Sequence, residues 1–498
     1  MSTRSGGNGL NGTNGAAAPS KDHKRLIVLC DGTWVDSNSV GKVKYPTNVT
    51  RFARCIKAKY TTIDDDGHKH DRPQVIFYQP GVGSASGTVL RGGLYGSGVS
   101  ATVRSAYAFL SHNYDIGDEI FFFGFSRGAY IARSIAGLVT SLGLLTKKGM
   151  DHFPLVYAKY YDHESHMTAT GPDSLPFEAA HADFVGQLEK KGLLHKQARE
   201  AVQVVGVWDT VGFHAAGMFE EKIEFRNCEL SPRVRCAYHA LALDERREPF
   251  TPTPWRVPKK ETVELAYPKG KDWGEQEMVQ CWFSGRHSDV GGGLDDPRLS
   301  DITLAWMIAQ VAKGGKLAFT DIDSKDDYLI DSEKTPGPEA EGTPWATSKG
   351  SANEPEWYYK MMRTFYSADR SPLTYLEEGR KVREASQEET HEYIHRSVMD
   401  RNLDGRGKGV QWVCNVLCGK THGKTGAYGL ARDETKGLPL APKVVRDVEG
   451  PDGQKQEQDV EAYFKGRVVR IMGTDIGADD KIADVEKKLG NTGFVGME

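Results

Sequence analysis

Regular cysteine spacing, long hydrophobic runs and an excess of positive charge are all missing from this sequence. Its seven cysteines form no pattern typical of a disulfide framework, which favours reduced thiols in a cytosolic protein. No run approaches the roughly 18 apolar residues that a membrane-spanning helix requires. With a net charge of -4, the chain also has no basic footprint for nucleic acid. We therefore expect a cytoplasmic protein with no transmembrane segment and no nucleic-acid partner.

Changes in composition along the 498 residues predict four segments. Residues 1–23 are rich in Gly, Asn, Ser and Ala and lack the apolar core of a signal peptide, so we expect a disordered polar tail. Residues 24–320 alternate strand-like apolar runs with helical periodicity, as a catalytic α/β domain does. Residues 321–355, rich in Pro, Gly, Ser and acids, predict a linker or long loop. Residues 356–498 are expected to form an extension that packs on the α/β domain.

The pentapeptide Gly-Phe-Ser-Arg-Gly at 124–128 is the clearest functional motif. It joins the aromatic run 120–123, which is typical of a strand, to residues 129–138, whose apolar positions repeat at helical spacing. A strand, a tight turn centred on Ser126 and a helix form a nucleophile elbow, in which the flanking glycines avoid steric conflict. Ser126 is therefore the predicted nucleophile. The N–H of Arg127, at the start of the helix, is predicted to stabilise an oxyanion.

A nucleophilic serine needs an imidazole base, and the imidazole needs a carboxylate that orients it. After a nucleophile elbow, these partners follow in the order acid, then histidine. Asp209 ends the hydrophobic strand 201–208, and His287 follows the strand 279–284 in a glycine-rich loop. The C-terminal ends of strands are where such sheets expose functional groups. The predicted catalytic residues are therefore Ser126, Asp209 and His287.

Each predicted partner of the serine has an alternative interpretation. Asp209 is also compatible with a turn former, and His287 with a structural histidine in a tight loop. Asp289 is a second candidate carboxylate, and His395 is a reserve candidate for the base. The His-x-Asp pattern is also found in metal sites, but no second ligand cluster of suitable spacing accompanies it. We therefore predict neither a metal nor a cofactor.

The loop after the first predicted strand completes the candidate site. Residues 24–30 form an apolar run that opens onto residues 31–34. In a fold with a nucleophile elbow, the strand two before the elbow carries the second donor of the oxyanion hole. Gly32 and Thr33 are therefore predicted to line the oxyanion hole, and Trp34 to contact the substrate.

The Asp-Gly-Thr triplet at 31–33 is also typical of haloacid-dehalogenase phosphatases. In those enzymes the nucleophilic aspartate stands two residues before the aspartate of the triplet. Here that position is Leu29. Phosphatase chemistry thus lacks its nucleophile.

The first third of the chain has the order strand, helix, strand, helix, strand, with the serine after the third strand. The strands are expected at 24–30, 74–78 and 120–123, and the helices at 49–56 and 101–114. This order predicts an α/β fold, a mostly parallel sheet with helices on both faces.

Residues 145–200 interrupt the strand–helix alternation with several short helical patterns. An insertion at this place caps the cleft in some hydrolases, and then Tyr157, Tyr160 and Tyr161 would bind the substrate through apolar walls. The equally open alternative is a peripheral packing helix.

Five motifs taken together resemble a known family. They are Cys30-Asp31-Gly32-Thr33, Pro80-Gly81-Val82-Gly83, Gly124 to Ala129, Trp208-Asp209-Thr210-Val211-Gly212 and Gly285 to Gly293. This set, over about residues 24 to 310, resembles the α/β-hydrolase family that includes bacterial type VI secretion phospholipase effectors, and within it the members of fungal type. The resemblance implies an α/β-hydrolase-like fold, the triad of Ser126, Asp209 and His287, and lipid esters as the substrate class.

We therefore predict a serine hydrolase that cleaves carboxylic esters through an acyl-enzyme. The expected enzyme is an esterase or a lipase, and the lipases considered include phospholipases. The expected partner is a small-molecule or lipid ester. Two alternatives stay open: a hydrolase-fold binding or scaffold protein without turnover, and a serine hydrolase that acts on another acyl bond.

Overall fold

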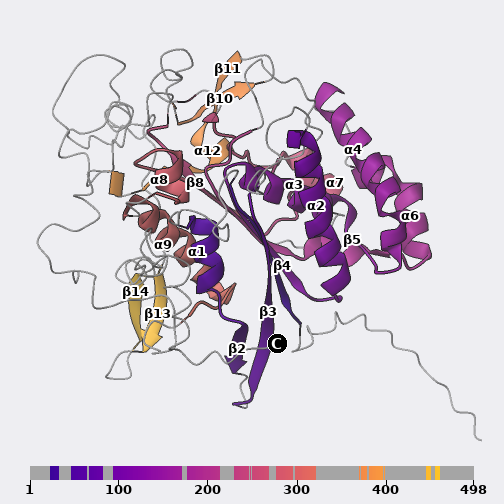
Figure 1. Cartoon of the computed structure of the whole chain (residues 1–498), viewed down its shortest axis with the longest axis horizontal. Coiled ribbons are helices and arrows are strands. Elements are labelled where there is room, and N and C mark those ends of the chain that lie inside the picture. The colour runs from indigo at the N-terminus through magenta and orange to yellow at the C-terminus, as the bar shows by residue number, and fades with distance from the viewer. Residues whose placement is uncertain are drawn as a thin grey trace, which may run out of the picture.

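A mostly parallel sheet forms the centre of the computed structural model (Figure 1). Its eight strands have the order β12-β9-β8-β7-β4-β1-β3-β2, and every neighbouring pair is parallel except β2 and β3. In chain order, these strands are β1 (Arg25–Cys30), β2 (Lys59–Ile63), β3 (Lys69–Gln79), β4 (Glu119–Phe125), β7 (Val202–Trp208), β8 (Cys236–Ala242), β9 (Glu277–Phe283) and β12 (Glu392–Ile394). The predicted α/β fold class is confirmed.

The structure describes residues 23–32, 46–63, 67–81, 94–170, 177–212, 229–245, 247, 250–267, 276–294, 298–320, 370, 372–377, 381–395, 397–398, 445–449 and 455–459. The helices are α1 (Asn48–Cys55), α2 (Leu94–Asn113), α3 (Arg127–Leu142), α4 (Phe153–Thr170), α5 (Phe177–Ala180), α6 (Ala182–Lys190), α7 (Lys260–Ala266), α8 (His287–Gly291), α9 (Arg298–Ala312) and α12 (Gln387–Thr390). Short two-stranded ladders join β5 (Leu144–Leu145) to β6 (Leu194–His195), β10 (Thr374–Glu377) to β11 (Lys381–Glu384), and β13 (Val445–Glu449) to β14 (Lys455–Asp459).

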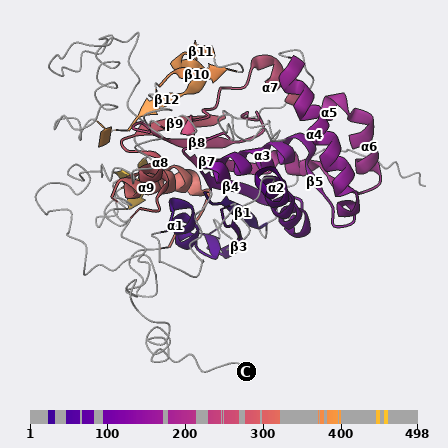
Figure 2. The same cartoon turned by 45° about the horizontal axis from the view of Figure 1, so that its top comes forward.

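Successive residues of β1 point into two different hydrophobic layers. Leu26 and Val28 belong to the layer that the sheet forms with α2 and α3, whereas Ile27 and Leu29 belong to the layer formed with α1 and α9. Figure 2 shows these helix pairs on opposite sides of the sheet. All six residues of β1 are buried, as expected for a central parallel strand covered on both faces. This double covering explains why the strand reads as a continuous apolar run.

Two strands of the sheet, β2 and β8, were not predicted from the sequence. β2 precedes β3 and pairs with it antiparallel, so the serine follows the fourth strand of the chain and not the third. The sequence of β2 is largely polar because alternate residues face solvent at the edge of the sheet. β8 lies between β7 and β9 and contains three alanines, which have low strand propensity, yet it is fully buried. Pairing on both sides outweighs this low propensity.

The predicted insertion at 145–200 is helical, and part of it forms hydrophobic core. Tyr157 and Tyr160 of α4 and Phe177 of α5 are buried in the layer that contains α2 and α3. The rings of Tyr160 and Phe177 meet edge to face at 5.3 Å, and the hydroxyls of Tyr157 and Ser100 lie 3.2 Å apart. This is the arrangement of a packing helix. Substrate contacts by Tyr157, Tyr160 and the partly buried Tyr161 stay a prediction that this packing does not favour.

A strand from the C-terminal third of the chain completes one end of the sheet. β12 pairs in parallel with β9, with Glu392 opposite Gln280. The carboxylate of Glu392 accepts a hydrogen bond of 2.6 Å from the indole N–H of Trp282 and one of 3.0 Å from the N–H of Leu373. These contacts connect a segment from beyond residue 370 to the sheet of the α/β domain.

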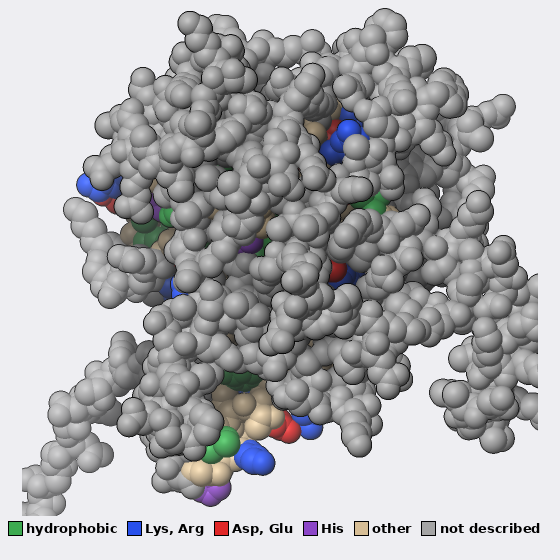
Figure 3. Space-filling view, turned by 90° about the vertical axis from the view of Figure 1, so that its left-hand side faces the viewer, with side chains coloured by type: hydrophobic (Ala, Val, Ile, Leu, Met, Phe, Trp, Pro, Cys, Tyr) green, Lys and Arg blue, Asp and Glu red, His purple; other side chains and the backbone are tan. Residues whose placement is uncertain are grey.

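Figure 3 shows one face of the molecule, on which side chains of the described residues are visible in a few separate areas of mixed type. No helix in the described part of the chain combines the length and apolar character that crossing a membrane would require.

Replacing Gly128 with alanine should lower the free energy of unfolding by about 1–3 kcal/mol. A Cβ atom at this second residue of α3 would lie 2.3 Å from the carbonyl oxygens of Cys30 and Asp31, so the helix could not approach the end of β1. Urea denaturation followed by circular dichroism measures the change. Gly186→Ala in α6 is the matched control, because the added Cβ would have no atom within 4 Å apart from its chain neighbours and the backbone of its own helix. Equal stability of the two variants would contradict this close approach.

Candidate active site

Ser126 lies in a strained turn between β4 and α3. Its φ of 59° and ψ of -126° are values that side-chain-bearing residues rarely adopt. Its N–H donates to the carbonyl oxygen of Trp208 on the neighbouring strand at 3.0 Å. A Cβ atom at Gly124 would lie 2.6 Å from the carbonyl oxygen of Gly128, so the first position of the motif requires a glycine. The second glycine, Gly128, is required because a Cβ atom there would collide with the carbonyl oxygens of Cys30 and Asp31. The strand–turn–helix arrangement predicted around the serine is therefore present.

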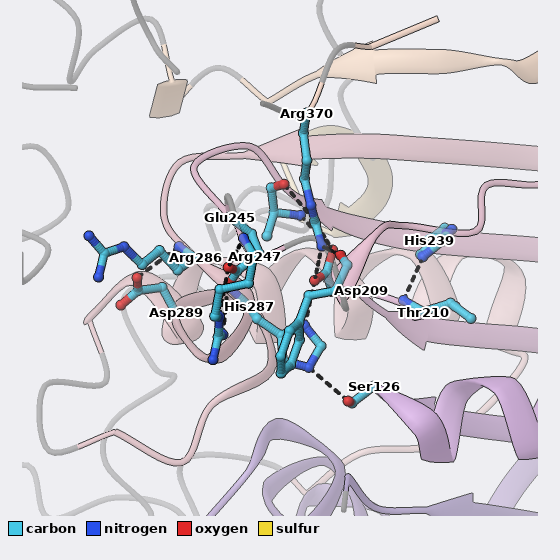
Figure 4. Close-up of polar contacts among 12 residues, drawn as sticks. Ser126, Asp209, Thr210, His239, Glu245, Arg247, Arg286, His287, Asp289 and Arg370 are labelled. Carbon is cyan, nitrogen blue, oxygen red and sulfur yellow. Dashed lines mark hydrogen bonds and ion pairs between the residues drawn. The ribbon is translucent and has the colours of Figure 1, made fainter. Parts of the chain in front are cut away.

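The structure brings Ser126, His287 and Asp209 together. In Figure 4 the imidazole lies between the hydroxyl and the carboxylate: Nε2 of His287 is 2.7 Å from Oγ of Ser126, and Nδ1 is 2.6 Å from Oδ2 of Asp209. With its proton on Nδ1, the imidazole donates to the carboxylate and accepts from the serine hydroxyl. Asp209 follows β7 and His287 begins α8 after β9, so the ends of parallel strands place all three side chains at one edge of the sheet.

Apolar rings enclose the imidazole of His287. The rings of Phe125 and Phe250 lie 4.6 and 4.7 Å from it, centroid to centroid, and only 4 % of the residue is exposed. Burial lowers the pKa of His287 below the ordinary value, against the opposing effects of Asp209 and Glu245. The imidazole is therefore held in the neutral form that can accept a proton.

Arg370 is a residue of the site that the sequence prediction missed. Its guanidinium donates to both oxygens of Asp209, at 2.6 Å to Oδ1 and 3.0 Å to Oδ2. Burial alone would raise the pKa of Asp209, but the charge of Arg370 and the hydrogen bond from His287 lower it well below the ordinary range. Arg370 stands 161 residues beyond Asp209, in a stretch without a recognisable motif. No signal in the sequence pointed to it.

Glu245 is a second buried carboxylate beside the imidazole. Its Oε2 accepts a bond of 3.3 Å from the backbone N–H of His287, and Arg247 pairs with both of its oxygens, at 2.8 and 2.7 Å. Burial would raise the pKa of Glu245, but the hydrogen bond and charge of Arg247 lower it to about 2. Glu245 thus anchors the first residue of α8 as an ionised group.

The loop predicted to line the oxyanion hole is only partly described. Gly32 lies next to the serine, since a Cβ atom there would be 3.5 Å from Cβ of Ser126. Its N–H donates to Oδ1 of Asp31 at 2.7 Å in this structure, so the role of Gly32 in the oxyanion hole stays a prediction. Thr33 and Trp34 lie outside the described residues. Arg127 is the first residue of α3, where N–H groups and the helix dipole favour an anion.

Asp31 belongs to a buried polar cluster next to Gly32. Its carboxylate accepts hydrogen bonds from the hydroxyls of Thr47, Thr50 and Tyr78 at 2.7 to 3.0 Å, besides the N–H of Gly32. Burial raises the pKa of Asp31, and these hydrogen bonds act in the opposite direction. The cluster holds the backbone at Gly32 close to the serine.

The alternative partners considered from the sequence have other contacts. His395 stacks on Phe283 at 4.6 Å, and its Nδ1 lies 2.7 Å from Oγ of Ser397. Asp289 accepts a hydrogen bond of 2.8 Å from the N–H of Arg286 at the start of α8. Among the described residues, no group of three or more His, Cys, Asp and Glu side chains could hold a metal ion.

The sheet order and the serine between β4 and α3 define an α/β-hydrolase-like protein. Residues 24–310, more than half of the chain, match the family model described as "T6SS, Phospholipase effector Tle1-like, catalytic domain". The chain therefore belongs to this family, as the resemblance of its motifs predicted. Arg370 lies beyond the matched residues.

Several known proteins are similar to this chain. The uncharacterized protein YEL023C of Saccharomyces cerevisiae is 27% identical over 274 residues, which are 50% of this chain and 36% of the yeast protein. An uncharacterized protein from Pseudomonas aeruginosa shares 16% identity at a TM-score of 0.32, over 58% of this chain and 45% of that one. The Tle1 effector bound to the VgrG spike of the type 6 secretion system shares 17% identity at a TM-score of 0.30, over 56% and 52%. The chain thus spans about a third to a half of the proteins it matches.

Ser126→Gly should be more stable than Ser126→Ala by about 1 kcal/mol, because glycine adopts a positive φ without the strain that a Cβ atom causes. The two variants both lack the hydroxyl, so their difference isolates the backbone. Chemical denaturation of both proteins measures it. If the alanine variant were equally stable or more stable, the turn would not have the φ of 59° described above.

Proposed function

We propose that this chain is a serine hydrolase that cleaves carboxylic esters of lipids through an acyl-enzyme. One observation carries the proposal: the hydrogen-bonded series of Ser126, His287 and Asp209, with the serine in a strained turn at a helix N-terminus. Nucleophile, base and orienting carboxylate are the three groups that acyl transfer requires. The buried, neutral imidazole is suited to take the proton of the serine.

The reaction proceeds in two halves. In the first, Oγ of Ser126 attacks the ester carbonyl while Nε2 of His287 takes the hydroxyl proton. The tetrahedral oxyanion is stabilised near the N-terminus of α3 by the N–H of Arg127. The intermediate collapses to an acyl-serine, and the leaving alcohol takes the proton back from His287. In the second half, water loses a proton to His287 and attacks the acyl group. The tetrahedral intermediate collapses, Oγ of Ser126 leaves and takes the proton back from His287, and the carboxylic acid is released.

Lipid esters are the substrate class that family membership supports, because the matching family is one of phospholipase effectors. The geometry of three polar side chains does not by itself distinguish an ester from another acyl bond. A panel of short p-nitrophenyl esters, phospholipid vesicles and amides, tested on purified protein, separates these classes. A lipid esterase hydrolyses the phospholipid or the short esters and leaves the amides intact. Turnover of the amide alone would assign a different acyl bond.

Ser126→Ala should lose nearly all turnover, by a factor of about 10³ or more, because the acyl-enzyme cannot form. His287→Ala should be about as damaging, since the two residues act as one unit. Asp209→Asn should also be severe because the amide favours the wrong imidazole tautomer. Turnover of the best ester and covalent labelling by a fluorophosphonate probe measure the loss.

His395→Ala is the control, because this second buried histidine stacks on Phe283 and is not part of the triad. It should retain labelling. A folded Ser126→Ala protein with undiminished turnover would refute the triad, and a wild-type protein that resists the probe would favour a binding or scaffold role.

The acid limb of kcat/KM should have its midpoint below the ordinary histidine pKa of 6.5. His287 acts as the base only when neutral, so activity is lost as the pH falls through its pKa, and burial lowers this pKa. A pH–rate profile on a soluble ester gives the midpoint. A midpoint above 6.5 would mean that the carboxylates around the imidazole outweigh its burial.

A further inference from the structure

Arg370 stands outside the part of the chain that matches the family model, yet it contacts the carboxylate of the proposed triad. We propose that Arg370 is a positioning residue that clamps Asp209 and sets the charge that His287 experiences. It has this role only if Ser126, His287 and Asp209 act as proposed above. The C-terminal segment then supplies a working part of the site.

The guanidinium forms a two-pronged clamp. Nη1 donates to Oδ1 of Asp209 at 2.6 Å and to the carbonyl oxygen of Ala242 at 2.7 Å, while Nη2 donates to Oδ2 of Asp209 at 3.0 Å and to the carbonyl oxygen of Phe250. The N–H of Ala242 adds a bond of 2.9 Å to Oδ1. In Figure 4, Arg370 approaches the carboxylate from above and His287 lies below it. Each carboxylate oxygen thus has two donors, which fixes the plane that orients the imidazole.

The same clamp changes the electrostatics of the base. An ionised Asp209 favours the imidazolium form of His287, but the adjacent positive charge of Arg370 cancels part of this effect. Among the described residues, the charged and titratable groups around the imidazole are Asp209 after β7, Glu245 with its partner Arg247 after β8, and Arg370 from the C-terminal segment. Arg370 is buried and bonds both oxygens of Asp209, so one substitution at this residue removes the positive charge from beside the carboxylate.

Arg370 is held in place by the strand that completes the sheet. Leu373, three residues further on, donates its N–H to Glu392 of β12, and Glu392 accepts from Trp282 of β9. The segment that carries Arg370 is therefore tied to the strand immediately before α8 and His287. The pairing of β12 with β9 and the contact of Arg370 with Asp209 are therefore linked through the same segment.

Two substitutions separate the charge of Arg370 from its geometry. Arg370→Gln removes the charge and should move the acid limb to higher pH by about one unit, because the pKa of His287 rises. Arg370→Lys keeps the charge but loses the fork, so it should lower kcat/KM by about tenfold without moving the limb. The rate of fluorophosphonate labelling and kcat/KM, each measured from about pH 5 to pH 9, report both effects.

Arg233→Gln is the matched control. Arg233 is also a largely buried arginine that bonds one carboxylate, Glu178 at 2.5 Å, and two backbone carbonyls, those of Thr140 and Ala266. Its loss should reduce stability and leave the pH profile unchanged. A merely structural role for Arg370 would give this same result.

The outcomes distinguish this inference from the proposed function. A wild-type protein that the probe does not label overturns both. If the wild type is labelled but Arg370→Gln keeps the wild-type acid limb, the clamp has no electrostatic role and the inference alone is overturned. If Arg370→Gln does not fold, Arg370→Lys decides: a reduced rate with an unmoved limb supports the clamp, and a wild-type rate refutes it.

Discussion

The site is organised around a carboxylate that is completely buried and ionised. Removing such a charge from water costs several kcal/mol unless charged and hydrogen-bonding partners surround it. Asp209 obtains these partners from three directions: the imidazole of His287, the backbone N–H of Ala242 and the guanidinium of Arg370. They come from after β9, from the end of β8 and from the C-terminal segment. The chain must therefore bring distant segments to the end of β7 before this carboxylate can be ionised there.

Three buried histidines show how environment separates residues that are identical in the sequence. His287 lies between a hydroxyl and a carboxylate. His239 accepts the N–H of Thr210 at 3.0 Å, and burial lowers its pKa to about 3, so it remains neutral. His395 stacks on Phe283. Of these three histidines, His287 is the one whose contacts fit the proton transfer proposed above, whereas His239 contacts Thr210 and His395 contacts Phe283.

Local sequence was sufficient to predict the elements that carry the proposed triad. The turn at 124–128 is defined by glycines within five residues, and Asp209 and His287 each follow an apolar strand directly. Arg370 could not be predicted in this way, because its contact spans 161 residues and its flanking sequence has no recognisable motif. The sequence also does not reveal that a side chain bonds a backbone group of the loop. Nothing in the order Asp-Gly-Thr shows that the carboxylate of Asp31 accepts a hydrogen bond from the N–H of Gly32. For Tyr157 and Tyr160, the sequence predicted a helical segment but left open whether it covers the cleft or packs on the domain, and both side chains are buried in the core.

The position of β12 has a consequence for the order in which the protein is made. A nascent chain that has been synthesised through α8 already contains Ser126, Asp209 and His287, but not Arg370 or the strand that pairs with β9. During the synthesis of the next hundred or so residues, the carboxylate lacks its guanidinium and β9 has an open edge. The final arrangement of the site is therefore a late event, and it follows the emergence of residue 394 from the ribosome.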